Sequence, residues 1–328
     1  MRKIALLSAG LAGMLTLILP ATPARALSLV TFVSPTGDDF HFNDCSSSTT
    51  PCRTFSHAIQ NTIPGGEIFC VPGVFDPRSP LDGLFQNFFT IAQSVTIDCG
   101  GGMGISFGFI TINGPGIVVK LRNLKINGGG LEDFEVGINA INMAALFIEN
   151  CQISGFTAPL SDAVGIKFAP DGVAATLHVS DSVITSNGLA DSGGGILIRP
   201  TGLLGFARVV IERTRVENNT HGIVADGHSI PGLIIIQIDG SMVAASAGNG
   251  IWAKQASIVV DRTSSKNNFG FGILADGSGS LVHLGNSTVA GNRTGLGATD
   301  GGQILSYQNN QTKGNGLDGE PTGVLSLN

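Results

Sequence analysis

Hydrophobic and polar residues alternate in short runs through the second half of the chain, and Gly or Asn separates the runs. A Gly followed by Ile or Leu recurs at spacings of 28, 30, 27, 28, 22, 23 and 21 residues, at Gly137, Gly165, Gly195, Gly222, Gly250, Gly272, Gly295 and Gly316. Short segments that alternate with period two between turn residues are typical of β-strands. A repeat of this length predicts a solenoid in which each repeat forms one coil of three short strands.

The second and third strands of each repeat carry two further patterns. An aliphatic residue precedes a small residue by three positions in six repeats, as the pairs Ile148/Cys151, Val179/Ser182, Ile211/Thr214, Ile238/Ser241, Val260/Thr263 and Leu284/Ser287. We expect the small residues to form an inward column whose hydroxyl groups bond up and down the stack. Asn tolerates left-handed backbone, and stacked Asn side chains can satisfy each other. Asn residues near the ends of the third strands are Asn187, Asn219, Asn268, Asn292 and Asn310.

A short helix is predicted before the solenoid, from Thr54 to Ile63. Phe55, Ala58, Ile59 and Thr62 fall on one face of this segment, and the sequence Pro64-Gly65-Gly66 is expected to end it before the first strand. An amphipathic helix here would cover the end of the solenoid, where strand edges and apolar core would otherwise meet water.

With these features the chain resembles the right-handed parallel β-helix proteins of the pectate-lyase-like superfamily, and specifically the secreted bacterial right-handed β-helix repeat proteins. The N-terminal residues that carry the resemblance are Phe32-Val33-Ser34-Pro35-Thr36-Gly37-Asp38-Asp39, Pro51-Cys52-Arg53-Thr54-Phe55 and Gly65-Gly66-Glu67-Ile68. The resemblance implies an all-β, single-stranded right-handed parallel β-helix over residues 67–328, preceded by an N-terminal cap over residues 27–66. It implies no particular activity, because the superfamily hosts lyases, hydrolases, epimerases and adhesins.

Charge and the first residues of the chain predict export. Arg2 and Lys3 precede an apolar run that leads to Ala24-Arg25-Ala26, so residues 1–26 have the pattern of a secretory signal peptide. The whole chain carries 18 Lys and Arg against 24 Asp and Glu; without the three basic residues of that segment the balance is 15 against 24, or −9. An acidic chain without a basic block is a poor partner for nucleic acid or an anionic membrane. No later segment reaches the roughly 20 apolar residues of a membrane span, so we expect a periplasmic or extracellular protein.

Five cysteines fit an oxidising compartment and leave at least one thiol unpaired. Cys45 and Cys52 bracket a Ser/Thr-rich loop and are predicted to form a disulfide. Cys70 and Cys99 end apolar alternations on neighbouring coils, where Cα atoms fall within the disulfide range of about 4.4–6.8 Å, so they form either a second disulfide or two buried thiols. Cys151 belongs to the small-residue column and is interpreted as a buried thiol rather than a nucleophile. Without a C-x-x-C or His-rich cluster, no zinc site and no cofactor are predicted.

The outward positions of the Gly-Ile strands give the main candidate site. Leu197, Val224, Trp252 and Leu274 would form an apolar stripe, beside a row of alternating charges at Arg199, Asp226, Lys254 and Asp276. An indole that stacks on a pyranose, with charged groups that bond hydroxyls or uronates, is typical of a sugar-binding surface. Alternatively, a loop or a second rod covers the stripe, and the charges neutralise each other.

Two other clusters are weaker candidates. Glu212, Asp239 and Asp261 lie in one column with Glu149 and Ser180, and their oxygens could bind Ca²⁺; the neighbouring Arg213 and Arg262 favour surface charge balance instead. Asp226, His228 and His221 form an acid–imidazole cluster that could perform acid–base chemistry, although satisfied surface polar groups explain it as well.

Motifs of the enzymes with this fold are not reproduced. Inverting polygalacturonases carry Asn-Thr-Asp, Asp-Asp, Gly-His-Gly and Arg-Ile-Lys, whereas here Asp38-Asp39 precedes the solenoid and Gly227-His228-Ser229 is a fragment. Pectate lyases place an Arg base in Arg-x-Pro-x-x-Arg, which Arg199-Pro200 does not match. The sequence favours a non-enzymatic exported β-helix that binds glycan or serves as a surface or periplasmic interaction rod. The alternative is a polysaccharide lyase or glycoside hydrolase acting on a uronate-containing polysaccharide, with Lys254 or Arg199 neutralising a uronate and Asp226, Asp276 or His228 as acid or base.

Overall fold

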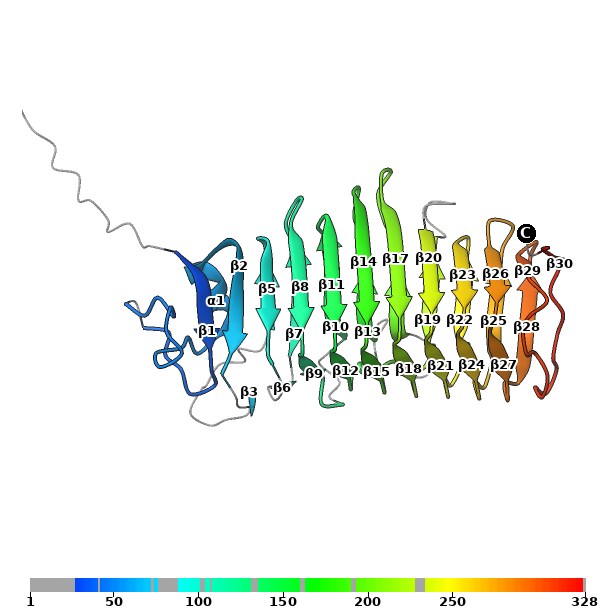
Figure 1. The fold of residues 1–328 in the computed structure, drawn as a ribbon, viewed down its shortest axis with the longest axis horizontal. Coiled ribbons are helices and arrows are strands. Elements are labelled where there is room, and N and C mark those ends of the chain that lie inside the picture. Colours follow the sequence, from blue (N-terminus) through cyan, green and yellow to red (C-terminus); the bar gives the residue numbers. More distant parts are fainter. Residues whose placement is uncertain are drawn as a thin grey trace, which may run out of the picture.

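The computed structural model describes residues 27–40, 42–71, 74–75, 88–100, 104–106, 108–130, 135–159, 163–189, 193–227 and 234–326. The predicted signal peptide and His228 lie outside these residues. The strands stack into a rod in which successive coils lie side by side (Figure 1). Every paired strand in the described residues is parallel to its neighbours, and the chain visits three sheets, here named A, B and C, once in each coil. The predicted parallel β-helix with three strands per coil is therefore confirmed.

Within the described residues, sheet A has twelve strands and sheets B and C have nine each. Sheet A consists of β1 Ser28–Val33, β2 Thr62–Cys70, β5 Val95–Asp98, β8 Val118–Arg122, β11 Ala145–Glu149, β14 Ala174–Ser180, β17 Phe206–Glu212, β20 Ile234–Asp239, β23 Ser257–Asp261, β26 Leu281–Gly285, β29 Gln303–Ser306 and β30 Gly323–Val324. Sheet B consists of β3 Val74–Phe75, β6 Gly104–Ser106, β9 Lys125–Asn127, β12 Gln152–Ser154, β15 Val183–Thr185, β18 Arg215–Glu217, β21 Met242–Ala244, β24 Ser264–Lys266 and β27 Thr288–Ala290. Sheet C consists of β4 Phe88–Ile91, β7 Phe109–Asn113, β10 Val136–Asn142, β13 Val164–Phe168, β16 Gly194–Ile198, β19 Ile223–Asp226, β22 Ile251–Lys254, β25 Phe271–Asp276 and β28 Thr294–Thr299.

The recurring Gly marks a place where the backbones of neighbouring coils approach too closely for a side chain. A Cβ atom on Gly222 would lie 2.4 Å from the carbonyl oxygen of Gly250, and one on Gly250 would lie 2.8 Å from that of Gly272. The recurring Gly residues form a column of such close contacts. Its last contact is between Gly295 and Asp318, whose carbonyl oxygen would lie 2.4 Å from a Cβ atom on Gly295. The predicted last member, Gly316, is thus outside the column. The repeat seen in the sequence is a steric requirement of coil stacking.

The aliphatic column on sheet A forms the centre of the core, as predicted. Its members are at most 1% exposed and pair in register, at Ile148, Val179, Ile211, Ile238, Val260 and Leu284. Burying one such side chain stabilises the fold by about 1.5–3 kcal/mol.

The small-residue column is buried as expected, but its hydroxyl groups do not bond to one another. Each hydroxyl accepts a hydrogen bond from the backbone N–H of the equivalent residue in the preceding coil. It donates a hydrogen bond to the carbonyl oxygen of the residue two positions earlier in its own coil. For example, Ser241 Oγ accepts from Thr214 N at 3.2 Å and donates to the Asp239 carbonyl at 2.9 Å. This pattern satisfies backbone groups at a corner where the ladder of the sheet is interrupted. Cys151 stands first in the column as a buried free thiol, as predicted, and burial raises its pKa to about 12.

Buried Asn side chains form a second ladder after the strands of sheet B. Asn187 donates to Asn219 Oδ1 at 3.0 Å, and Asn268 donates to Asn292 Oδ1 at 2.8 Å. Asn310 does not belong to this ladder: it accepts from Ser287 N in the small-residue column, and Asn315 takes the next ladder position instead. The left-handed residue of each turn is also a different one, such as Asn218 with φ of 56° directly before Asn219.

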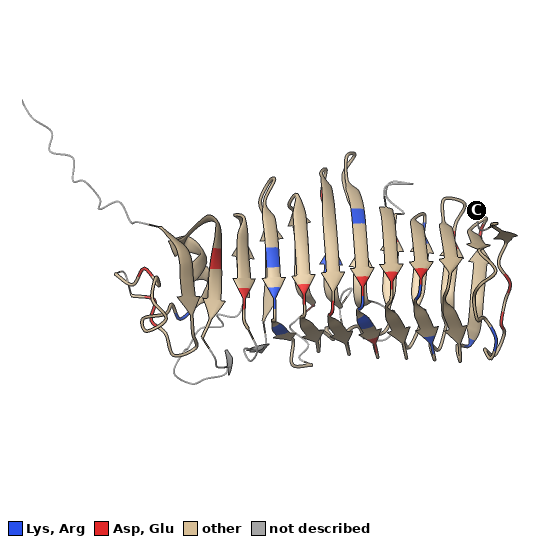
Figure 2. Ribbon diagram, viewed as in Figure 1, with Lys and Arg blue, Asp and Glu red and all other residues tan. Residues whose placement is uncertain are grey.

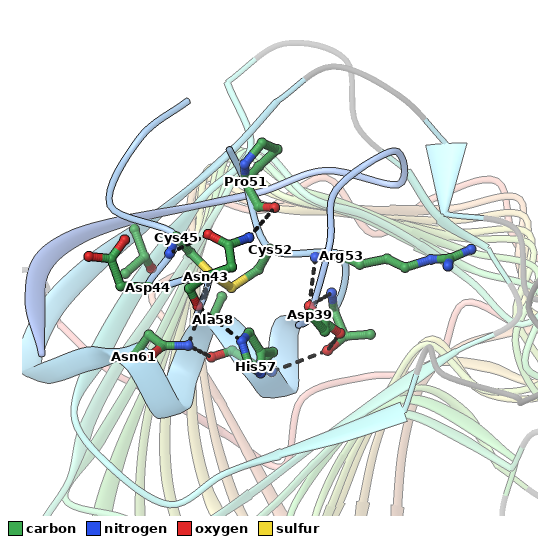
Figure 3. Close-up of a disulfide and its surroundings, with 12 residues drawn as sticks. Asp39, Asn43, Asp44, Cys45, Pro51, Cys52, Arg53, His57, Ala58 and Asn61 are labelled. Atoms are coloured by element: carbon green, nitrogen blue, oxygen red, sulfur yellow. Dashed lines mark hydrogen bonds between the residues drawn. A yellow bond between two sulfur atoms is a disulfide. The ribbon is translucent and has the colours of Figure 1, made fainter. Parts of the chain in front are cut away.

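The N-terminal helix α1, Phe55–Asn61, has its predicted face buried, and its ends are set by side-chain hydrogen bonds. Thr54 caps its N-terminus by accepting from His57 N, and the Asp39 carboxylate accepts from the backbone N–H groups of Arg53 and Thr54 (Figure 3). Phe55 stacks on Phe89 of β4 at 4.8 Å between ring centroids, which places the helix against the end of the core. The expected stop at Pro64-Gly65-Gly66 is wrong, because β2 already begins at Thr62 and runs through these residues.

The predicted Cys45–Cys52 disulfide is present, and of the two alternatives for Cys70 and Cys99 the structure shows the disulfide. Cys45–Cys52 holds a loop against the outer edge of β1, where Phe32 N donates to the Cys45 carbonyl and Cys52 N donates to the Phe32 carbonyl, both at 2.8 Å (Figure 3). The loop thereby covers an edge strand that would otherwise offer unpaired groups to another chain. Cys70–Cys99 joins two neighbouring coils, with Cα atoms 4.5 Å apart.

Candidate functional site

The predicted apolar stripe exists in register on sheet C, but most of it is buried. Leu197, Val224, Trp252 and Leu274 occupy successive strands at paired positions. The three aliphatic residues are 5–8% exposed, and Leu197 and Val224 pack with Val164 and Trp252 in a small cluster outside the main core. Of the two interpretations of the stripe, this burial favours packing for the aliphatic members. Trp252, which is half-buried, is the member that reaches solvent.

The indole of Trp252 is fixed on several sides. Lys254 places its ammonium group over the ring, 4.1 Å from its centroid, and the His221 ring lies against it at 5.3 Å with a tilt of 55°. The indole N–H donates to the Asp276 carboxylate at 3.3 Å. A sugar that stacks on the face next to Lys254 must therefore displace the ammonium group. The contact with His221 comes from a turn rather than a strand, so strand alternation could not have indicated it.

The predicted row of charges is also in register, and the structure resolves how each charge is held. Asp226, Lys254 and Asp276 occupy paired positions on β19, β22 and β25. Arg199 binds Asp226 with its Nη2 atom 3.0 Å from the carboxylate, whose side chain is 10% exposed. Asp276 accepts from Trp252 Nε1 and, at 2.8 Å, from the Thr299 hydroxyl. The sequence suggested mutual neutralisation along the row; among its four members, all within the described residues, the structure shows an ion pair between Arg199 and Asp226.

His221 accepts a backbone hydrogen bond at Nδ1 from Asn249 N, at 3.0 Å. His221 has a packing contact with the candidate site, whereas His228, its proposed neighbour, lies outside the described residues.

The acidic column lies on sheet A, near the carboxyl ends of its strands, where Figure 2 shows it as a row of red bands. Arg262 binds both Asp239 and Asp261, and Glu212 contacts both Arg213 and His178. Glu149 binds Arg122 at 2.7 Å, so four of the five oxygen-bearing positions considered for Ca²⁺ have basic partners in the described structure, which supports the charge-balance interpretation. In the described residues, the side chains of Cys45, Cys52 and His57 lie close enough together to hold a metal ion. The two sulfur atoms are bonded to each other in a disulfide, so they are not available as thiolate ligands.

Through its ion pairs with Asp181 and Glu212, Arg213 makes the free energy of unfolding depend on pH. It binds Asp181 through two hydrogen bonds of 2.8 and 2.9 Å and Glu212 through one of 2.9 Å, and it lowers the pKa of both carboxyl groups below their ordinary values of 3.8 and 4.5. A lowered pKa in the folded state stabilises the fold above the ordinary pKa, and this contribution is lost as the pH falls through the lowered value.

We therefore expect Arg213→Gln to reduce the free energy of unfolding at pH 7 only slightly, because these ion pairs lie at the surface. The difference from the unmodified protein should shrink as the pH falls below about 4. Urea unfolding at several pH values measures it, with Arg293→Gln as an exposed control. A difference that stays constant across this range would contradict the assignment.

A shallow hollow of about 430 Å³ lies in the N-terminal cap, away from sheet C, and is lined in part by Asp38, Phe42, Asn43 and Asp44. Phe42 is 99% exposed at its rim. Sequence reasoning did not single out this hollow, which depends on the path of the loop between β1 and α1.

Comparison with known proteins identifies the fold. No protein-family model matches the sequence, and no curated protein matches it. Among solved structures, pectate lyase Pel9A is similar, with a TM-score of 0.51 and 14% sequence identity over 88% of this chain and 79% of that one. In the described residues no helix is long and apolar enough to cross a membrane. The two disulfides are consistent with an exported protein, since disulfides persist in oxidising compartments. Its three parallel sheets and this likeness identify the chain as a right-handed parallel β-helix with the pectate-lyase-like fold.

Proposed function

We propose that the protein is an exported β-helix that binds polysaccharide along the outer face of sheet C without cleaving it. The observation that carries the proposal is the Lys254 ammonium group held over Trp252, within the in-register row that also contains Asp226 and Asp276. A cation held beside an amphipathic ring, with carboxylate acceptors on the neighbouring strands, is suited to the carboxylates and hydroxyl groups of acidic sugars.

The geometry of the coils favours a polymer over a small ligand. Adjacent strands lie about 4.8 Å apart, so equivalent side chains repeat at that interval along the rod. A polysaccharide that crosses the strands presents its own repeated groups in the same direction. Rigid strands also keep the site preorganised, which reduces the entropy lost on binding.

Export is supported by the apolar N-terminal segment after Arg2 and Lys3 and by the two disulfides. Polysaccharides are abundant outside cells, so the compartment and the proposed ligand agree.

Binding to a panel of neutral and uronic oligosaccharides by calorimetry tests the proposal. We expect Trp252→Ala and Lys254→Gln each to weaken binding roughly tenfold, because they remove the ring and the cation at the centre of the face. Lys120 and Phe147 provide matched controls, since they form a similar pair on sheet A, with the ammonium group 5.8 Å from the ring centroid. Phe147→Ala and Lys120→Gln should leave binding unchanged.

The melting temperature of each variant separates binding from folding. Lys254→Gln should melt as the unmodified protein does, because its side chain is half-exposed. Absence of binding to every sugar in the panel, or equal losses in the sheet A controls, would refute the proposal.

A polysaccharide lyase is the second candidate, favoured by the pectate lyase among similar structures and by the cations Lys254 and Arg199 on the same face. Mass spectrometry of the incubated oligosaccharides distinguishes the alternatives. Products with unsaturated ends would identify a lyase, products with one added water a hydrolase, and intact oligosaccharides that bind are the expected result.

A further inference from the structure

We infer that Lys254 and Asp276 select polysaccharides in which each acidic sugar is followed by a neutral one. This inference rests on the proposed function and specifies its ligand class. It follows from the way in which the charges on sheet C are compensated, one strand at a time.

In this inference, Lys254 binds the carboxylate of the acidic sugar. Its ammonium group is held by the π face of Trp252, 4.1 Å from the centroid. A cation–π contact leaves the charge of the ammonium group in place, together with its N–H donors. Among the described residues no carboxylate forms an ion pair with Lys254, so a uronate carboxylate can bind it without displacing one of them.

Asp276 keeps its negative charge on the next strand. Its two oxygens accept from neutral donors, the Trp252 indole and the Thr299 hydroxyl. These hydrogen bonds orient the carboxylate without neutralising it. A second carboxylate placed at this strand would be repelled, whereas a sugar hydroxyl could donate to it.

Asp226, on the strand before Lys254, has a different character. It is bound to Arg199 and its side chain is only 10% exposed, so its charge is compensated within the protein. Along sheet C a compensated acid is thus followed by a cation and then by an anion.

The spacing of the strands determines which sugar of the ligand lies over each of these charges. Paired positions lie about 4.8 Å apart, which is comparable to the advance of one pyranose in an extended chain. With one carboxylate over Lys254, the next sugar lies over Asp276. In a homopolymer of uronates that sugar is charged, while in an alternating polymer it is neutral.

Three probes of matched length test the inference: oligogalacturonate, a hyaluronan oligosaccharide that alternates glucuronate with a neutral sugar, and a neutral cello-oligosaccharide. Calorimetry at low, fixed ionic strength preserves the charge effects. We expect the alternating probe to bind about fivefold more tightly than oligogalacturonate, a ratio typical of one exposed charge pair.

Asp276→Asn is the decisive variant, because an amide oxygen can still accept from Trp252 while the charge is removed. It should raise the affinity for oligogalacturonate about fivefold relative to the affinity for the alternating probe. Asp98→Asn is the matched control on sheet A, where Asp98 likewise accepts from neutral donors, Asn123 Nδ2 and Gly100 N. It should change neither affinity.

The outcomes separate the inference from the proposed function. If oligogalacturonate binds as tightly as the alternating probe, or if Asp276→Asn has no effect on their ratio, the selectivity is refuted although sheet C still binds glycan. If none of the three probes binds, the proposed function fails and the inference fails with it.

Discussion

Replacing Gly222 by Ala should lower the free energy of unfolding by about 3 kcal/mol, because the new methyl group has no space. Its Cβ atom would lie 2.4 Å from the Gly250 carbonyl oxygen and 2.3 Å from Val243 Cγ1. The carbonyl belongs to the stacked backbone and cannot rotate away as a flexible side chain could. Separating the two coils would also disturb the hydrogen bond from Gly222 N to the Asn249 carbonyl.

Gly279→Ala is the matched control for this variant. A Cβ atom on Gly279 would meet Gln255 at 3.6 Å, an ordinary contact, so we expect a change within about 0.5 kcal/mol. Chemical denaturation followed by far-UV circular dichroism measures both variants. Equal stability of the two would show that close approach of the coils is not what the recurring Gly provides.

Asn219→Ala should lower the free energy of unfolding by about 4 kcal/mol, because it leaves several buried groups without partners. Asn219 Oδ1 accepts from Asn187 N at 2.9 Å and from Asn187 Nδ2 at 3.0 Å, and its own Nδ2 donates to the Ile184 carbonyl at 2.9 Å. The residue is 2% exposed, so water cannot replace these bonds without entering the core.

Asn309→Ala tests whether burial is the cause. Asn309 bonds to Asn286 through the same kinds of groups, accepting from its backbone N–H and donating to its Oδ1, but on an exposed turn. Water can satisfy the groups that this variant releases, so the loss should be below about 1 kcal/mol. Similar losses for Asn219→Ala and Asn309→Ala, measured by the same denaturation, would contradict the role given to the buried ladder.

The coil pattern could be read from the sequence because its causes repeat in every coil. Gly222 and Gly250 obey the same steric rule, and Ile211 and Ile238 fill equivalent positions in the core. Twofold alternation then assigned the outward positions, including Trp252 and Lys254, to the correct strands. Because every coil repeats the same pattern, the alignment of one repeat can be verified against the others.

Features that depend on turns or on single side-chain conformations could not be read in this way. Asn310 and Asn315 both lie near the end of the rod, where the repeat changes, and the sequence assigned the wrong one to the Asn ladder. Burial of Leu197 and Leu274 depends on packing beyond the strand, which alternation does not encode. The placement of Lys254 over Trp252 depends on a side-chain conformation, so only the shared strand and spacing of these residues were visible beforehand.

Hydrogen–deuterium exchange with and without the alternating oligosaccharide tests the central claim most directly, because it locates the bound ligand without any substitution. We expect slower exchange in β19, β22 and β25 and in the turns that lead into them, with no change in the strands of sheet A. Protection centred on sheet A or on the N-terminal cap, with sheet C unchanged, would contradict the assignment of the binding face.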